Sequence, residues 1–353
     1  MYYLSITYIY ILTVVYTKEI TKVSKGRNQM DTGTHLVMGF TLGGLATLSP
    51  VVLNDPHLTN ALLLTTIIGS QLPDSDTILK LRNNAKYLKH HRGITHSIPA
   101  VIGWTLALSI IMTLFNQRDH FGIFLFWSFI AVSVHVFVDL FNAYGTQALR
   151  PFSNRWIAFG IINTFDPIIF ILHLIGVPFV IFHFKAGPIC ILLYIIMVFY
   201  YAFRYRQKRI VIQTVYNKLP EAKHVYVSPS IKYTHYHIVA SSDTHHYVGK
   251  IKQRNFTIHD KFKRIPLPVI EDVKAALKDE NVKSFLAFSP VYIWELIGHD
   301  EHKELRLIDL RYRTDTYYPF VAVVKFDYDH HIISSFTGWI FSEKKLQKKL
   351  KMD

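Results

Sequence analysis

Long apolar runs fill most of residues 31–203 of this 353-residue chain, and they set the strongest limit on how it can fold. An apolar segment of about 20 residues can cross the ~30 Å hydrocarbon core of a bilayer as a helix, because a helix satisfies its own backbone hydrogen bonds. The pattern predicts an α-helical integral membrane domain of about six helices over residues 30–203. The six runs are residues 34–53, 58–72, 98–115, 121–140, 158–183 and 187–203.

Two prolines interrupt the fifth of these runs. Proline removes a backbone donor and disturbs the preceding helical turn. We therefore expect a kink or a break near Pro167 or Pro178.

The remaining residues, 204–353, have the composition of a soluble domain. Runs such as "HVYVSPSIKYTHYHIVAS" and "YYPFVAVVKFDY" alternate apolar and polar residues and are rich in Val, Ile and Tyr, which is typical of β-strands. The stretch "VIEDVKAALKDE" is typical of a helix, and the tail "SEKKLQKKLKMD" of a basic helix or a frayed end. The sequence predicts a small α+β soluble domain after the membrane domain.

Basic residues are concentrated in alternate loops. Residues 80–92, residues 141–157 and the stretch "RYRQKR" carry Lys and Arg, whereas the intervening loops have few. Basic loops mark the cytoplasmic side of a membrane protein. We therefore expect a multi-pass protein of the cell membrane with its C-terminal domain in the cytoplasm.

The formal net charge of +14 predicts anionic partners. Membrane lipids supply such partners at the headgroups beside basic loops. We expect no nucleic acid partner, because the sequence contains no recognisable nucleic-acid-binding module.

The N-terminus contains an internal methionine, Met30, preceded by "KGRNQ". Lys-Gly-Arg before a methionine is what a purine-rich ribosome-binding site gives when it is translated. We hypothesise that translation begins at Met30 and that residues 1–29 are a mis-called extension. A short amphipathic or membrane-dipping segment is the alternative interpretation.

Histidines and aspartates gather at the predicted cytoplasmic ends of the apolar runs, in the motifs "DTGTH", "LPDSD", "HHRGITHS" and "HVFVD". The orientation of the helices is predicted from the Lys and Arg content of the loops alone. That these histidines and aspartates all fall at one membrane face is therefore independent support for a shared site. Ionisable groups in membrane segments are costly and indicate function. The candidates are His35, Asp74, Asp76, His91, Arg92, His96, His135 and Asp139.

Each motif also has a structural interpretation. His135 and Asp139 are four residues apart and share a helix face, so they can bind one cation or simply hydrogen-bond each other. Asp74 and Asp76 follow Pro73, and taken alone this motif is better explained by helix-end capping and solvated loop charge than by a site. Together, however, the motifs predict one shared site.

Imidazole and carboxylate ligands without a thiolate fit a catalytic zinc site, with manganese or iron as alternatives. The single cysteine, Cys190, lies within an apolar run, and we expect it to be structural. The predicted metal ligands are His35, Asp76, His91, His96, His135 and Asp139. We assign Asp74 the role of general base and Arg92 that of neutralising a substrate phosphate, because its planar fork matches phosphate oxygens.

The four motifs "MDTGTHLVMG", "GSQLPDSD", "HRGITHS" and "HVFVDLFNAYGTQALRPFS" occur in order over residues 30–200. They resemble the YdjM/YfhP group of membrane-bound metal-dependent hydrolases, itself remotely similar to zinc-dependent phospholipase C and S1/P1-type nucleases. The resemblance implies a hydrolase whose motif positions are the histidines and aspartates named above, and it implies no particular substrate.

We therefore expect a metal-dependent hydrolase that acts at the cytoplasmic face on phosphoester or phospholipid substrates. The alternative is a non-enzymatic membrane anchor or a transporter-like protein. A transporter is expected to hold its ionisable groups near the membrane midplane rather than near one face.

Overall fold

A computed structural model describes residues 32–75, 92–116, 120–314 and 317–350. The chain divides into two compact units, whose described parts are residues 32–75 with 92–205, and residues 206–350. Several sequence predictions lie outside the described residues. They concern residues 1–29, Met30, Asp76, His91 and most of the basic loop 80–92.

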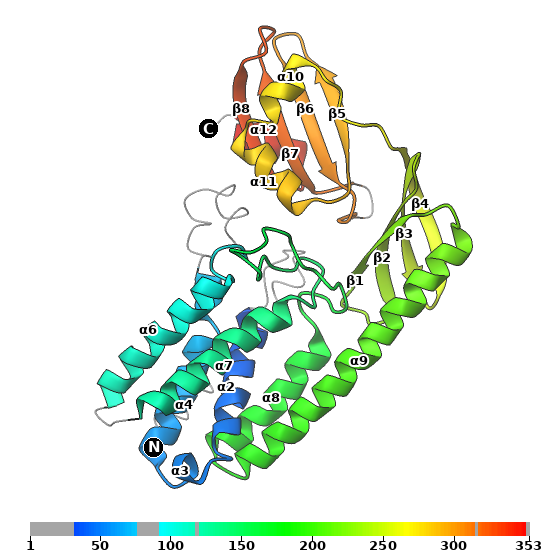
Figure 1. Ribbon diagram of the computed structural model, residues 1–353. Coiled ribbons are helices and arrows are strands. Elements are labelled where there is room, and N and C mark those ends of the chain that lie inside the picture. Colours follow the sequence, from blue (N-terminus) through cyan, green and yellow to red (C-terminus); the bar gives the residue numbers. More distant parts are fainter. Residues whose placement is uncertain (1–31, 76–91, 117–119, 315–316, 351–353) are drawn as a thin grey trace. The chain divides into compact units, whose positions relative to one another are not determined.

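The first unit is helical, as predicted, and Figure 1 shows its helices packed side by side. The expected run 34–53 is interrupted and forms two helices, α2 and the one-turn α3. The expected run 158–183 is helical only from Pro167, which occupies the first turn of α8, while Pro178 lies inside that helix. The helices are α2 (Thr32–Ala46), α3 (Pro50–Leu53), α4 (Pro56–Gly69), α6 (Ile98–Asn116), α7 (Phe121–Asp139), α8 (Pro167–Ile181) and α9 (Ala186–Lys218).

Among the described residues, three helices are long and apolar enough to cross a membrane: α6, α7 and α9. The other three main helices, α2, α4 and α8, have only 14 or 15 residues. At 1.5 Å per residue they reach about 21–23 Å, which is short of the ~30 Å hydrocarbon core. Three of the about six expected helices are therefore long enough to span a membrane, and the run 58–72, which forms most of α4, is already short for a span in the sequence.

Apolar side chains cover the outward faces of the long helices. Ile102 and Ile110 on α6, Phe126 on α7 and Phe199 on α9 are each about half exposed or more. A soluble protein rarely leaves so many large apolar side chains in contact with water, whereas lipid tails would cover them.

Glycines bring α2 and α4 into close contact. A Cβ atom added to Gly39 would lie 2.7 Å from Ile67 Cα and 2.6 Å from Ser70 Oγ. The Thr66 hydroxyl donates a hydrogen bond to the Gly39 carbonyl at 2.8 Å. Gly39 and Gly43 form the small-xxx-small pattern that lets membrane helices approach closely.

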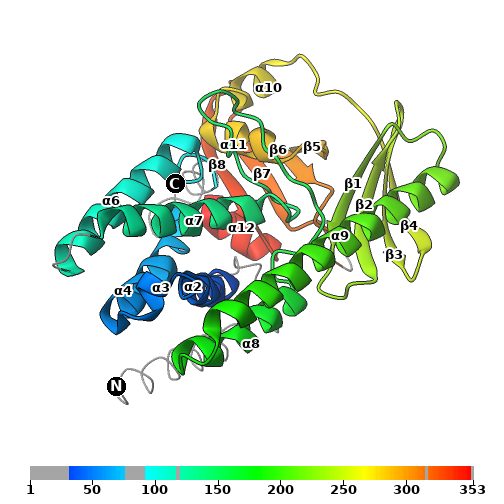
Figure 2. The same cartoon turned by 60° about the horizontal axis from the view of Figure 1, so that its bottom comes forward.

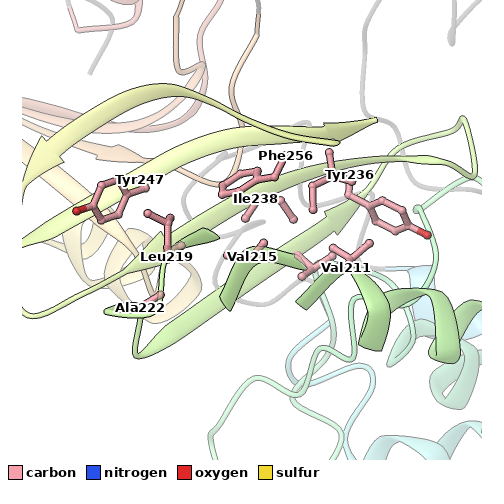
Figure 3. Packing of buried hydrophobic residues seen from close by; sticks show 11 residues of the cluster. Val211, Val215, Leu219, Ala222, Tyr236, Ile238, Tyr247 and Phe256 are labelled. Carbon is pink, nitrogen blue, oxygen red and sulfur yellow. The ribbon is translucent and has the colours of Figure 1, made fainter. Parts of the chain in front are cut away.

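The second unit begins with a four-stranded antiparallel sheet in the order β1-β2-β3-β4. The last turns of α9 cover one face of it, and Figure 3 shows Val211 and Val215 of the helix, with Leu219 just after it, packed against Tyr236 and Ile238 of the sheet. The strands are β1 (His224–Pro229), β2 (His235–Ser241), β3 (His245–Lys252) and β4 (Asn255–Lys263).

A second antiparallel sheet follows, in the order β5-β6-β7-β8. Alternate residues of β7 point to opposite faces, so that Val324 packs against α10 and α11 while Val323 packs against α12. Figure 2 shows α10 and α11 on one side of the sheet and α12 on the other. The elements are α10 (Glu271–Ala276), α11 (Glu280–Phe288), β5 (Tyr292–Gly298), β6 (Lys303–Asp309), β7 (Phe320–Phe326), β8 (Ile332–Trp339) and α12 (Glu343–Leu350).

The α+β class predicted for the C-terminal region is confirmed, with one addition. The strands do not form one sheet but two separate four-stranded meanders. Hairpin pairing explains this arrangement, because every strand pairs with its neighbour in sequence.

Candidate metal centre

Four buried side chains from separate parts of the first unit converge at one point. Asp74 lies in the short turn after α4, His96 lies just before α6, and His135 and Asp139 lie in the last turns of α7. One ligand atom from each lies within 4.8 Å of the others. The ends of three helices therefore bring together residues that the sequence predicted for a shared site.

The tautomer of His135 is set by the end of α4. His135 Nδ1 lies 2.6 Å from the Ser70 carbonyl oxygen, which can only accept a hydrogen bond, so Nδ1 carries the proton and donates it. Nε2 then faces Asp74 Oδ1 at 3.7 Å and Asp139 Oδ2 at 3.6 Å, and in the neutral ring this nitrogen carries the lone pair. A histidine that donates through one nitrogen and presents the other is typical of a metal ligand.

His96 is completely buried, and its Nε2 lies 3.2 Å from Asp139 Oδ2 and 3.7 Å from Asp74 Oδ1. Burial lowers the pKa of His96 to about 4, although the hydrogen bond to Asp139 acts in the opposite direction. The imidazole is therefore neutral near pH 7, which is the form that binds metal.

His35 of α2 adds a fifth group to this cluster. Its ring stacks on the His135 ring with centroids 3.8 Å apart, and its Nε2 lies 3.5 Å from Asp139 Oδ1. It contacts the opposite oxygen of Asp139 from the one that faces His96 and His135. His35 thus lies beside the four-residue group rather than at its centre.

The hydrogen bonding and spacing of the ligand atoms show whether these residues fit a metal ion. Among the described residues, Asp74 Oδ1 and His135 Nε2 are buried and have no hydrogen-bond partner, which is costly for two polar atoms. Two ligands held about 2.1 Å from a tetrahedral zinc ion lie about 3.4 Å apart. The separations of 3.2–3.7 Å between histidine nitrogens and carboxylate oxygens are close to this value, so the residues fit a divalent cation.

Arg92 is buried with the cluster and has a left-handed backbone conformation, with φ of 57°. Its Nη2 donates to Asp139 Oδ1 at 2.8 Å, and its carbonyl accepts from the Gln147 amide at 2.8 Å. Its Nε and Nη1 atoms have no hydrogen-bond partner among the described residues. Arg92 therefore holds Asp139 with one end of its fork and retains unused donors.

Asp74 occupies a different place from the one predicted for a general base. Its Oδ1 atom lies equally close to the Nε2 atoms of His96 and His135, at 3.7 Å from each. This position fits a metal ligand better than a separate base. Asp76 and His91, two of the predicted ligands, lie outside the described residues.

Sequence reasoning missed two polar contributors. Asn142 donates to Asp139 Oδ1 at 3.4 Å and also accepts from two backbone amides of the following turn. His173 is buried in α8 and its Nδ1 lies 2.8 Å from Thr41 Oγ1. A single histidine in an otherwise apolar helix was the signal that could have identified His173.

Asp166, near the same end of the helices, has a structural role. Its carboxylate accepts from the amides of Ile168 and Ile169, which caps the N-terminus of α8. It also accepts from the Tyr200 hydroxyl at 2.8 Å. These bonds account for this buried carboxylate without a metal.

A second group of potential ligands, His299, His302 and Glu304, lies on the β5–β6 hairpin of the second unit. The Glu304 carboxylate is already paired with Arg306 at 2.6 Å and accepts from Gln347 at 3.1 Å. Since the negative charge is compensated, this group is better explained as an ion-pair network than as a metal site.

Comparison with known proteins confirms the expected resemblance. Residues 30–211 match the YdjM inner membrane protein family, residues 220–262 match the YfhP middle domain, and residues 271–350 match the YfhP C-terminal alpha/beta plait domain. The uncharacterized protein YfhP of Bacillus subtilis (strain 168) is 48% identical over 327 residues, which cover 92% of this chain and 99% of that protein. No solved structure matches the chain.

Proposed function

The chain belongs to the YdjM inner membrane protein family, and we propose that it is a metal-dependent hydrolase that acts on phosphoesters at the cytoplasmic face of the membrane. One observation carries the proposal: two imidazoles and two carboxylates, all buried, converge with ligand atoms within 4.8 Å of one another. Arg92 compensates the charge of Asp139, whereas Asp74 Oδ1 is buried without a hydrogen-bond partner, and a metal ion bound between Asp74 and the imidazoles would compensate this second carboxylate.

The ligand set of this centre would be Asp74, His96, His135 and Asp139, with His35 beside it. Two nitrogen and two oxygen donors without thiolate suit zinc, and manganese or iron are the alternatives. A divalent cation supplies Lewis acidity toward water and toward a phosphoryl oxygen when it is bound.

The chain's own residues would hold and orient the reacting groups. The Ser70 carbonyl keeps the proton of His135 on Nδ1, so that Nε2 stays available as a ligand. Arg92 fixes Asp139 through Nη2, and its Nε and Nη1 donors would bind phosphate oxygens. The surrounding helices exclude bulk water, which strengthens each of these electrostatic interactions.

The test is a metal analysis of the purified full-length chain, combined with hydrolysis of 4-nitrophenyl phosphate and of phosphatidic acid. We expect about one divalent metal ion per chain, lost together with activity in His135→Ala and Asp139→Ala. His120→Ala is the matched control, because His120 lies at the opposite end of α7 and outside the cluster.

Retention of metal by both cluster variants would contradict the proposed site. A stable protein that binds metal but hydrolyses neither substrate would contradict phosphoester hydrolysis. If alanine at the cluster positions changed neither metal content nor cellular function, the chain would instead act as a membrane anchor.

A further inference from the structure

A cavity of about 240 Å³ lies among α2, α7, α8 and α9, inside the helical unit. Its wall is mainly apolar and includes Met38, Val134, Val138, Ile169 and Met197. Each of these residues belongs to a helix of the first unit, so the cavity is formed by the same helices that carry the metal centre.

The cavity shares two residues with the metal centre. His35 and Asp139 line it, and they lie 3.5 Å apart through Nε2 and Oδ1. Any molecule that fills the cavity therefore contacts side chains that also contact the centre. An apolar compartment that borders polar groups suits an amphiphilic ligand.

Two residues of the cavity wall are also exposed on the outside of the helices. Phe137 of α7 is 56% exposed and Val198 of α9 is 67% exposed. Both helices are long and apolar enough to cross a membrane. The side of the unit between α7 and α9 would therefore face lipid chains directly, and an acyl chain could enter from that side without crossing water.

We propose that this cavity binds one acyl chain of a membrane phospholipid and thereby places the phosphate of the headgroup at the metal centre. The inference rests on the proposed function, and it names a lipid rather than a water-soluble phosphoester as the substrate. The volume is below the ~300–1,000 Å³ of sites for drug-sized ligands, so it admits one chain rather than two.

The cavity would select among acyl chains by their shape, and it would add little hydrophobic free energy to lipid binding. An acyl chain that leaves the bilayer exchanges one apolar environment for another, so no gain from leaving water is available. Shape and packing against Val134, Val138 and Met197 would then decide which chain fits. His35 and Asp139 connect this compartment to the candidate metal centre, where a bound cation and the donors of Arg92 would hold the headgroup phosphate.

Photo-crosslinking of the full-length chain in phosphatidylcholine nanodiscs tests this inference. The probe is a lysophosphatidic acid that carries a diazirine on its acyl chain, and the labelled positions are mapped by mass spectrometry. We expect labels on the segments around Met38, Val134 and Met197, and competition by unlabelled lysophosphatidic acid but not by glycerol phosphate.

Val134→Trp should fill the cavity and lower this labelling about tenfold. Ile195→Trp is the matched control, because it adds a similar bulk on α9 at a position that is 48% exposed and outside the cavity wall. If Val134→Trp does not give a folded protein, Val138→Trp makes the same test from the next turn of α7. Labels confined to outward residues such as Ile102 and Ile195, or labelling unchanged by either cavity variant, would overturn the inference.

The labelling needs neither bound metal nor turnover, so the two proposals can fail separately. Specific labelling of a chain that binds no metal would leave the lipid cavity intact and contradict the hydrolase. Metal-dependent hydrolysis of 4-nitrophenyl phosphate without labelling of the cavity would support the hydrolase and contradict a lipid substrate bound in this way.

Discussion

At the residue scale, the Ser70 carbonyl connects the backbone to the chemistry of the centre. Ser70 is the C-cap of α4, and the last carbonyls of a helix have no partner within it. His135 Nδ1 satisfies this carbonyl at 2.6 Å, which directs Nε2 toward Asp74 and Asp139. One hydrogen bond thus satisfies a carbonyl at a helix end and orients a candidate metal ligand.

Arg92 offers a test of phosphate recognition apart from metal binding. Arg92→Lys keeps the positive charge beside Asp139 but loses the planar fork, so we expect unchanged metal content and a fall in kcat/KM for phosphoesters of about 10²-fold. Metal analysis and steady-state kinetics measure the two effects. Arg155→Lys, on an exposed loop residue, is the control and should leave both unchanged. Equal losses of metal and activity in Arg92→Lys would assign Arg92 a structural role.

The environment of Glu304 lets us predict how the stability of the second unit depends on pH. Burial alone would raise the pKa of Glu304, but hydrogen bonds from Arg306 and Gln347 outweigh it and lower the pKa to about 2. The lowered pKa means that this residue stabilises the fold above about pH 4.5, and that the contribution is lost as the pH falls toward 2.

Glu304→Gln should therefore lower the free energy of unfolding by about 1–3 kcal/mol at pH 7 and flatten its dependence on pH between 4.5 and 2. Thermal unfolding of the full-length chain over this range measures the effect. Glu301→Gln, at an exposed position of the same hairpin, should leave the profile unchanged. A parallel profile for Glu304→Gln and the unmodified chain would disprove the assignment.

At the element scale, the close contact of α2 with α4 positions the candidate metal centre. Gly39 lies against Ile67 and Ser70, so the distance between these helices determines where the C-cap of α4 lies. The same C-cap carbonyl binds His135. Packing between two helices of 14 and 15 residues is thereby transmitted to a ligand on α7.

Gly39→Ala should destabilise the chain, because the added Cβ would meet the Ile67 backbone at 2.7 Å. We expect a loss of about 1–3 kcal/mol, as for other overpacked cores, together with weaker metal binding. Gly103→Ala is a matched control on α6, where an added Cβ would meet no atom within 4 Å among the described residues. It should be neutral or stabilise by up to about 1 kcal/mol, since alanine is the better helix former.

Thermal melts in detergent and metal titration measure both consequences of the Gly39 change. If the two alanine variants melted alike and bound metal alike, the close approach of α2 and α4 would have no role in forming the site. A shift in stability without a change in metal affinity would show that the contact of α2 with α4 stabilises the fold but does not position the metal ligands.

At the scale of the whole molecule, the polarity of the helices explains why the candidate ligands gather at one end. α2 begins there, α4 ends there, α6 begins there and α7 ends there, so successive helices alternate in direction. From the basic loops of the sequence, the positive-inside rule predicts that this end faces the cytoplasm.

Cysteine accessibility in whole cells tests this orientation. We expect a membrane-impermeant maleimide to label Asn54→Cys, which is exposed between α3 and α4, and to label Ser342→Cys only after the cells are lysed. The single native cysteine, Cys190, is buried and should contribute little background. The reverse pattern of labelling would place the second unit and the metal centre outside the cytoplasm.

Local sequence patterns determined much of the fold. Apolar runs of helical length predicted the helical unit, and period-two alternation predicted the strands, because both signals depend on neighbouring residues. The same patterns did not reveal that α2 and α8 are short or that the strands form two sheets. Helix ends and strand partners depend on packing and pairing that a local pattern does not fix.

The sequence by itself determined that histidines and aspartates lie at the ends of the apolar helices. Because successive helices alternate in direction, His35, Asp74, His96, His135 and Asp139 then lie at the same end of the helical unit. Only the tertiary structure decided that Asp74 lies among the candidate ligands, that His135 directs Nε2 toward it, and that an apolar cavity borders His35 and Asp139. The reason is physical: the order of residues fixes hydrophobicity and helix direction, whereas distances between side chains up to about a hundred residues apart are set by how the helices pack.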